Sequence, residues 1–273
     1  MKTMLIDPSR CIQCCNCQNA CKDEHCDNDW RPVAAPQGPG QFWIQVRERQ
    51  AATGSRMRLE RVPVPCQQCA RPACKAAAPD AVLQRADGLV LLDPEAAGDK
   101  ALVESCPYGA IYWNAERGIA QKCTGCAHLL DAGWERPRCV SACPTDALSY
   151  VDEDELVESR LYAPLERLGP EHGTAPRVAY VNLPRPFVAG AVYSPNEDRC
   201  LEGVKVVLAY AGASNGAVYR ASTDFLGEFR VGGIEPGFYT LHLEKDGYAS
   251  KRIAKLDACD ALNVGEIRLY PVR

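Results

Sequence analysis

Cys11-Ile-Gln-Cys14-Cys15-Asn-Cys17-Gln-Asn-Ala-Cys21 is the stretch that decides the fold of this chain. Two residues separate Cys11 from Cys14 and Cys14 from Cys17, and three separate Cys17 from Cys21. A loop with this spacing lets three thiolates reach three irons of one 4Fe-4S cluster, whereas the fourth thiolate points toward a neighbouring cluster. The stretch therefore predicts a cluster-binding fold in which distant segments exchange their last cysteines.

A complementary run lies near residue 140. It reads Cys123-Thr-Gly-Cys126, then an insertion of 12 residues, then Cys139-Val-Ser-Ala-Cys143-Pro144. If the two runs exchange their last cysteines, each of two clusters receives four thiolates. The predicted ligands are Cys11, Cys14, Cys17 and Cys143 for cluster A, and Cys123, Cys126, Cys139 and Cys21 for cluster C.

A second pair of cysteine runs is nested between these two and lacks four expected cysteines. Cys66, Cys69 and Cys74 are followed by Ala78-Pro79 where a fourth cysteine belongs, and Cys106-Pro107 closes a run whose other cysteines are absent. Under the same exchange, the complete set for cluster B is Cys66, Cys69, Cys74 and Cys106. The four substituted positions are Ala78, Ala96, Asp99 and Leu102. All four losses fall on one set, which predicts three 4Fe-4S clusters and one vacant former site.

Two other uses of cysteine were considered. Sixteen cysteines also suit a secreted disulfide scaffold, and Cys-x-x-Cys pairs also occur in zinc ribbons. Fourteen of the sixteen lie before residue 144 and twelve fit one ligand pattern, which disfavours both alternatives. The other four are predicted to be ordinary thiols: Cys15 and Cys26 near a cluster, and Cys200 and Cys259 buried in the C-terminal domain.

The histidines and basic residues give weaker signals. The four histidines follow no metal-binding spacing and are expected to be structural or surface residues: His25, His128, His172 and His242. Four cations stand beside predicted ligand cysteines: Lys22, Lys75, Lys122 and Arg138. Such cations raise the reduction potential of a negatively charged cluster, and plain solvation by water is the alternative role.

Composition limits the class of protein. The formal net charge of -4 argues against a general nucleic-acid binder. The chain is 47% hydrophobic, yet it contains no apolar run of about 18 residues that would insert into a membrane. The N-terminus has no apolar segment of signal-peptide length before the first cysteine, which favours a cytoplasmic protein.

The sequence predicts an α+β protein with two domains. Residues 1–186 form the cluster domain, with an insertion at 22–65 that contains a strand at 42–46, and with a closing tail at 151–186. Short alternating segments with frequent turns predict a seven-stranded antiparallel β-sandwich at 187–273. The expected strands are 187–193, 204–210, 217–221, 228–231, 238–243, 248–253 and 264–269.

The nested cysteine runs, over residues 1 to about 186, resemble the iron-sulfur subunits of the dimethyl sulfoxide reductase family of molybdopterin oxidoreductases. This resemblance implies a double ferredoxin-like domain that conducts electrons and is not catalytic on its own. It implies a heterodimer with a large catalytic subunit, which alone carries molybdenum and bis(molybdopterin guanine dinucleotide). The usual members keep four clusters and have no sandwich. The sandwich itself resembles the carboxypeptidase-regulatory or collagen-binding B-type (Cna-B) module.

Within that family, three clusters followed by a sandwich resemble the small subunits of trihydroxybenzene transhydroxylases. These enzymes of anaerobic metabolism move a hydroxyl group between aromatic rings without net oxidation, so the clusters would set or store the redox state of the metal. The iron-sulfur subunit of another molybdenum or tungsten reductase or dehydrogenase is the nearest alternative. A free polyferredoxin carrier is a second one, which the long insertion and the sandwich disfavour.

Overall fold

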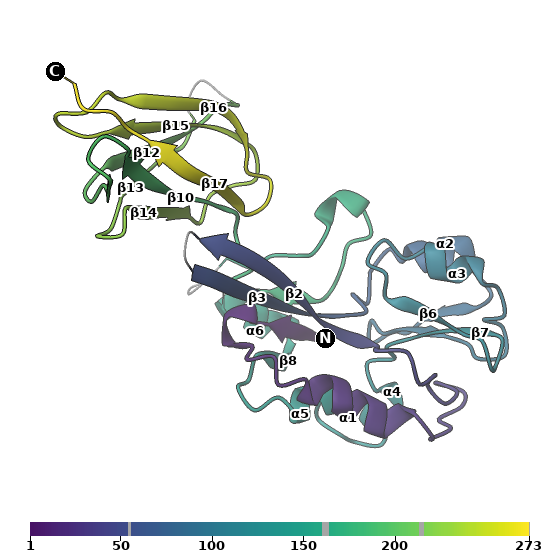
Figure 1. Cartoon of the computed structure of the whole chain (residues 1–273). Helices are drawn as coiled ribbons and strands as arrows, with labels where there is room; N and C mark the ends of the chain where they lie inside the picture. Colours follow the sequence, from purple (N-terminus) through teal and green to yellow (C-terminus); the bar gives the residue numbers. More distant parts are fainter. Residues whose placement is uncertain (54–55, 160–163, 213–215, 273) are drawn as a thin grey trace. The chain divides into compact units, whose positions relative to one another are not determined.

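The computed structural model describes residues 1–53, 56–159, 164–212 and 216–272 (Figure 1). They form two compact units. One comprises Met1–Glu48 with Arg61–Leu183, and the other comprises Arg49–Glu60 with Pro184–Arg273. The C-terminal part of the second unit thus begins at Pro184, three residues before the boundary at residue 187 that the sequence predicts. The second unit also includes part of the insertion, Arg49–Glu60.

A three-stranded sheet forms the centre of the first unit. β1 (Lys2–Ile6) lies between β8 (Leu148–Asp152), with which it pairs antiparallel, and β9 (Ala179–Tyr180), with which it pairs parallel. Ile6 and Tyr180 are fully buried, and the Tyr180 hydroxyl donates to the Pro63 carbonyl (3.1 Å). The sheet therefore joins the first segment of the chain to the segments that follow the last cysteine run.

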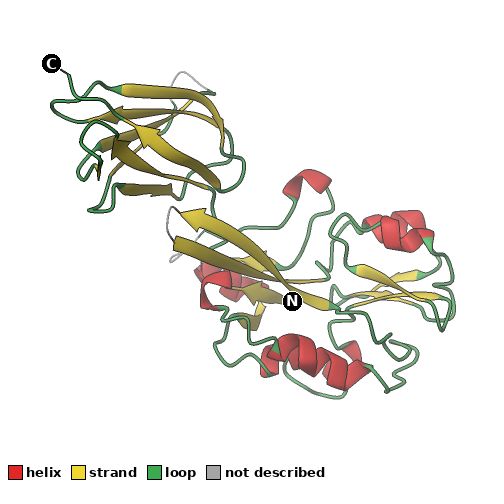
Figure 2. Cartoon of the chain, in the orientation of Figure 1, coloured by secondary structure: helices red, strands yellow, loops and turns green. Residues whose placement is uncertain are grey.

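The helices of this unit are short, and a few of the cysteines lie in them (Figure 2). α1 (Asn16–His25) packs against α5 (Arg138–Ser141), and both contribute to a core that includes Ile6, Trp43 and Tyr180. Cys15 precedes α1 in the left-handed conformation (φ 59°), so the chain turns sharply before the helix. The remaining short elements are η1 (Pro8–Arg10), α4 (Ala127–Asp131), α6 (Glu153–Ser159) and η2 (Pro170–His172).

The nested segment contains two successive helix–hairpin motifs, each made of one helix followed by one hairpin. α2 (Ala73–Ala77) precedes the hairpin of β4 (Val82–Gln84) and β5 (Val90–Leu92). α3 (Ala101–Glu104) precedes the hairpin of β6 (Ile111–Asn114) and β7 (Ile119–Lys122). Aliphatic side chains of both helix–hairpin motifs share one core.

The insertion contains a longer hairpin than the sequence indicates. Only residues 44–46 of the expected strand at 42–46 lie in β2 (Ile44–Thr53), which pairs with β3 (Arg56–Pro65). The side chain of Gln121 fixes the preceding loop, because its Nε2 donates to the carbonyls of Ala35 (3.1 Å) and Pro36 (3.0 Å). Charged residues after Val46 hide the alternation that would have predicted this extension.

Two four-stranded sheets make up the C-terminal part of the second unit. Each of the seven expected segments contains a strand, and a two-residue strand is added, so the expected number of seven is wrong for the described residues. The strands are β10 (Phe187–Ser194), β11 (Arg199–Cys200), β12 (Lys205–Tyr210), β13 (Val218–Ser222), β14 (Glu228–Gly232), β15 (Phe238–Glu244), β16 (Lys251–Asp257) and β17 (Leu262–Arg268). Both sheets contribute to one core, for example through Val188 and Leu241.

The purely antiparallel arrangement is also wrong, because β17 pairs parallel with β10. The chain leaves β16 in one sheet and enters β17 in the other, and such a crossover permits a parallel pairing that a tight hairpin does not. Gly190 lies at the irregularity in this pairing. A Cβ atom there would lie 3.0 Å from the Gly265 carbonyl oxygen, so the two strands approach closely because the residue is glycine.

Candidate iron-sulfur sites

The thiols proposed for cluster A lie where the first and last cysteine runs meet. Cys11 follows β1 and η1, Cys17 is in the first turn of α1, and Cys143 follows α5 just before β8. The pairing of β1 with β8 therefore brings the two runs together. Burial raises the pKa of Cys11, and charge on Cys143 and Cys14 adds to the shift. The thiols of the two runs are thus electrostatic neighbours.

The thiols proposed for cluster C come from three elements. Cys21 is on α1, Cys139 is on α5, and Cys123 and Cys126 lie between β7 and α4. Burial raises the pKa of Cys139 well above its usual range, and charges on Cys126, Cys123 and Cys21 add to it. The structure therefore brings Cys21 next to the later run, as the exchange of last cysteines requires.

The thiols proposed for cluster B line one cavity. Cys66, Cys69, Cys74 and Cys106 all contribute to its wall. Burial raises the pKa of Cys69 to about 11, and charges on the other three thiols of the set add to the shift. The closing tail reaches this cavity, because the Arg71 amide donates to the Thr174 carbonyl (3.0 Å). Tyr108 and Thr174 share a 2.6 Å hydrogen bond beside it.

Most of these thiols hold their protons in the absence of metal. Burial raises the pKa of Cys17 to about 12 and that of Cys126 to about 12. Cys143 is the exception: burial raises its pKa, but hydrogen bonds from the amides of Thr145, Leu148 and Ala147 together lower it below the usual value. Iron binds thiolates, so metal binding must release protons from the buried thiols.

Backbone amides already point at several sulfur atoms. The Gly125 amide donates to Cys123 Sγ (3.4 Å), and the Ala110 amide donates to Cys106 Sγ (3.5 Å). Hydrogen bonds to ligand sulfurs stabilise negative charge and tune the potential of a cluster. The loops are therefore arranged for thiolate ligands rather than for neutral thiols in a core.

The four positions of the vacant fourth site do not surround one space. Leu102 is 1% exposed and belongs to the core of the nested segment, and Ala78 packs against that core. Ala96 and Asp99 are exposed, and Asp99 Oδ1 accepts from the Ala101 amide (2.8 Å) at the start of α3. Apolar packing and a turn contact thus occupy positions where a cluster would need thiolates.

The donor sets fit cubane clusters better than single ions. All sixteen cysteines are free thiols. Among the described residues, no three His, Cys, Asp or Glu side chains gather closely enough to hold one metal ion. The thiolates of a 4Fe-4S cluster bind four different irons, so they surround a volume instead of converging on a point. The cavity lined by Cys66, Cys69, Cys74 and Cys106 has this character.

The remaining cysteines lie outside the three sets. Cys26 forms the C-cap of α1, five residues after Cys21. Cys200 and Cys259 are both exposed, so the expectation that they are buried is wrong. Cys200 lies on the short strand β11, and Cys259 lies in the loop after β16. Neither residue faces the core between the sheets, because both are exposed.

The four cations beside ligand cysteines differ in their surroundings. Lys22 Nζ donates to the carbonyls of Gly38 and Pro39 (both 2.8 Å), and no hydrogen bond from it to sulfur is found among the described residues. Arg138 pairs with Asp23 and Glu24 (both 3.3 Å). Lys122, in contrast, is buried and lies 3.5 Å from Cys66 Sγ. Sequence position alone does not distinguish these cases.

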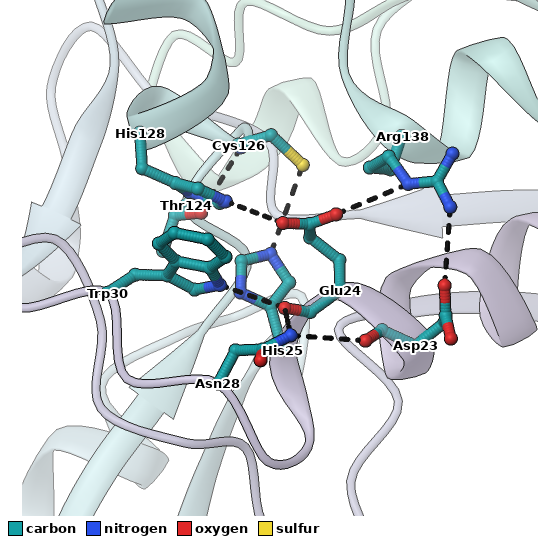
Figure 3. Close-up of polar contacts among 9 residues, drawn as sticks. All are labelled: Asp23, Glu24, His25, Asn28, Trp30, Thr124, Cys126, His128 and Arg138. Atoms are coloured by element: carbon teal, nitrogen blue, oxygen red, sulfur yellow. Dashed lines mark hydrogen bonds and ion pairs between the residues drawn. The ribbon is translucent and has the colours of Figure 1, made fainter. Parts of the chain in front are cut away.

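Two histidines form a buried network beside Cys126 that the sequence does not reveal (Figure 3). His25 Nε2 lies 3.9 Å from Cys126 Sγ, and burial lowers the pKa of His25 to about 3. His128 stacks on Trp30 (ring centroids 4.4 Å apart) and hydrogen bonds Glu24 (3.0 Å). His25 thus packs directly against a predicted ligand, and the ring of His128 lies against that of His25 (ring centroids 5.1 Å apart). His128 and Glu24 are 104 residues apart, so no local pattern predicts the contact.

Residues 57–153 match the family model of the 4Fe-4S dicluster domain. The chain is 37% identical to the pyrogallol hydroxytransferase small subunit of Pelobacter acidigallici, over 97% of this chain and 98% of that protein. It is 35% identical to the thiosulfate reductase electron transfer subunit PhsB of Salmonella typhi, over 56% of this chain and 78% of that subunit. A tetrathionate reductase subunit of Salmonella typhimurium is also 35% identical, over 68% of this chain and 74% of that protein.

No helix of the described residues has the length and apolar character needed to cross a membrane. The cysteine runs, the dicluster match and the relatives agree with one another. The chain belongs to the iron-sulfur subunits of the dimethyl sulfoxide reductase family of molybdopterin oxidoreductases.

Proposed function

We propose that this chain is an electron-transfer subunit with three 4Fe-4S clusters, bound by the sets A, B and C as defined above. The observation that carries the proposal is the cavity lined by all four thiols of set B, since three of these thiols come from one cysteine run and the fourth from a later segment. Sets A and C are supported by the electrostatic proximity of their members. A bound 4Fe-4S cluster takes up and returns one electron at a time.

The chain's own residues hold and shield such clusters. Five of the twelve proposed ligands are buried, which keeps water from their sulfur atoms: Cys17, Cys21, Cys74, Cys126 and Cys139. The amides of Gly125 and Ala110 stabilise the charge on Cys123 and Cys106. Cys14 is exposed, so set A is the set with a ligand at the surface. The ligand loops have little apolar core of their own, and cluster binding is therefore coupled to folding.

The partner in this proposal is a large molybdopterin subunit, which alone carries molybdenum with bis(molybdopterin guanine dinucleotide). The reaction proposed for the complex is pyrogallol–phloroglucinol transhydroxylation. Support comes from the extent of similarity: the hydroxytransferase relative matches 97% of this chain, including the sandwich, whereas the reductase relatives match 56% and 68%. Moving a hydroxyl group between two rings involves no net oxidation. Each electron that the clusters accept from the catalytic subunit must therefore return to it.

A second candidate is the iron-sulfur subunit of another molybdenum or tungsten reductase or dehydrogenase. It is favoured by the reductase relatives, which share the cysteine-run domain. A free polyferredoxin is the third candidate, and the sandwich gives it no support. A cytoplasmic location is part of the proposal, because sixteen free thiols suit a reducing compartment.

Anaerobic purification of the chain with any copurifying subunit tests the proposal. We expect about twelve irons and twelve labile sulfides per chain, following four of each per cubane. We also expect a larger partner that contains molybdenum or tungsten. Turnover of pyrogallol without an external electron acceptor would support transhydroxylation. An absolute need for such an acceptor would favour the second candidate, and a fully loaded chain without any partner would favour the third.

A further inference from the structure

Lys122 is a buried cation between the thiols proposed for clusters B and C. The residue is 3% exposed. Its Nζ lies 3.5 Å from Cys66 Sγ, donates to the Cys123 carbonyl (3.1 Å) and also donates to the Val90 carbonyl. Cys66 belongs to set B and Cys123 to set C. One ammonium group therefore contacts a ligand residue of each set.

In the described part of the chain, none of the hydrogen-bond partners of this ammonium group is a carboxylate. Its contacts are two carbonyl oxygens and one sulfur, and both carbonyls carry only partial charge. Burying a lysine without a full negative charge is costly, so buried charges are normally paired. Thiolates bound to iron would supply that charge. The position of Lys122 is thus explained by the loaded protein rather than by the metal-free core.

The position of Lys122 in the fold places it beside both sets. It is the last residue of β7, directly before Cys123 of set C. It also lines the cavity that all four thiols of set B line. Its charge therefore lies close to ligands of both sets.

Resting on the proposed function, we infer that Lys122 raises the reduction potentials of clusters B and C together, and that of cluster B more. The physical reason is that a nearby positive charge stabilises the extra electron of a reduced cluster, and burial keeps water from screening it. The effect is larger on cluster B because Nζ contacts Cys66 Sγ directly but reaches Cys123 through its carbonyl. If both clusters are bound, an electron passed between them would be lost by one and gained by the other, with no change of bond or proton.

Two variants remove the charge while keeping a side chain of similar length. Lys122→Gln retains a hydrogen-bond donor, and Lys122→Met retains an unbranched apolar chain. Lys75→Gln is the matched control, because Lys75 is also next to a set B ligand, Cys74, but is only partly buried. The complete chain is purified anaerobically with any subunit that accompanies it and is titrated with redox monitoring by electron paramagnetic resonance. The signal lost in Cys106→Ala identifies cluster B.

In both Lys122 variants, we expect reduction of cluster B to become about tenfold less favourable, which lowers its potential by about 59 mV for one electron. We expect a smaller shift in the same direction for cluster C, and none for cluster A. Lys75→Gln should leave all three potentials near those of the unchanged protein. Iron content should stay at the level of the unchanged protein in all three variants.

Several results would overturn the inference. Unchanged potentials in fully loaded Lys122 variants would do so, as would an equal shift in all three clusters. A shift in Lys122→Met alone would mean that a hydrogen bond, not charge, is responsible. Loss of iron from set B in both variants would assign Lys122 to holding the cluster. If the unchanged protein lacked three clusters, the proposed function itself would fail, and that result is visible before any variant is made.

Discussion

Replacing Cys106 by alanine tests the assignment of ligands most directly. Cys106 follows α3, and its sulfur lines the same cavity as the sulfurs of Cys66, Cys69 and Cys74. Sets A and C take no ligand from this cavity. We therefore expect Cys106→Ala to lose one cluster and keep two.

The magnitude follows from cluster stoichiometry. Iron and labile sulfide should fall from about twelve each per chain to about eight, a loss of one third. The Ala110 amide would lose its acceptor at 3.5 Å, and the three remaining thiols would surround an unfilled cavity. Because metal binding is coupled to folding in such loops, proteolysis should become faster in the nested segment first. The β1–β8 pairing should persist, since it depends on sets A and C.

Iron and sulfide analysis, cluster absorbance and limited proteolysis under anaerobic conditions measure these effects. Cys26→Ala is the matched control, because Cys26 is also partly exposed but belongs to no set. It should retain about twelve irons. Two results in Cys106→Ala would refute the exchange of last cysteines on which the three sets depend. One is loss of the signals assigned to cluster A or C. The other is loss of all iron while Cys26→Ala keeps its iron.

Three further changes probe the packing around the sites. Leu102→Ala removes a side chain that is 1% exposed and lies in the core of the nested segment. It should destabilise the first unit by about 2–5 kcal/mol, seen as a lower anaerobic Tm, and an unchanged Tm would show that this position is not packed. Leu241→Ala, in the core between the two sheets, should lower the free energy of unfolding by a similar ~2–5 kcal/mol. Iron content should stay intact, because the second unit contains none of the proposed ligands. Loss of iron would contradict the two-unit description. Glu24→Gln removes the carboxylate shared by His128 and Arg138, so thermal stability should fall by the equivalent of about 1.5–3 kcal/mol. Asp23→Asn affects a more exposed pair and should change thermal stability little.

Much of the chemistry is local and was therefore predictable from the sequence. The distance between Cys11, Cys14 and Cys17 is set by a few intervening residues, so their spacing alone indicates a cluster loop. The same holds for the short strands of the sandwich, whose alternation and turn residues act within about ten positions. The short eighth strand and the parallel pairing of β17 were missed, because they depend on which strands become neighbours in space.

The tertiary structure alone decided the environment of each cluster set. Lys22 and Lys122 occupy equivalent places beside cysteines in the sequence, yet Lys22 binds carbonyls near Phe42 and Lys122 is buried against Cys66. Ala78 and Leu102 entered a core, whereas Ala96 and Asp99 remained exposed. Ligand spacing is a property of short segments, but burial and charge around a thiol arise from residues about a hundred positions apart, whose meeting depends on the packing of the whole unit.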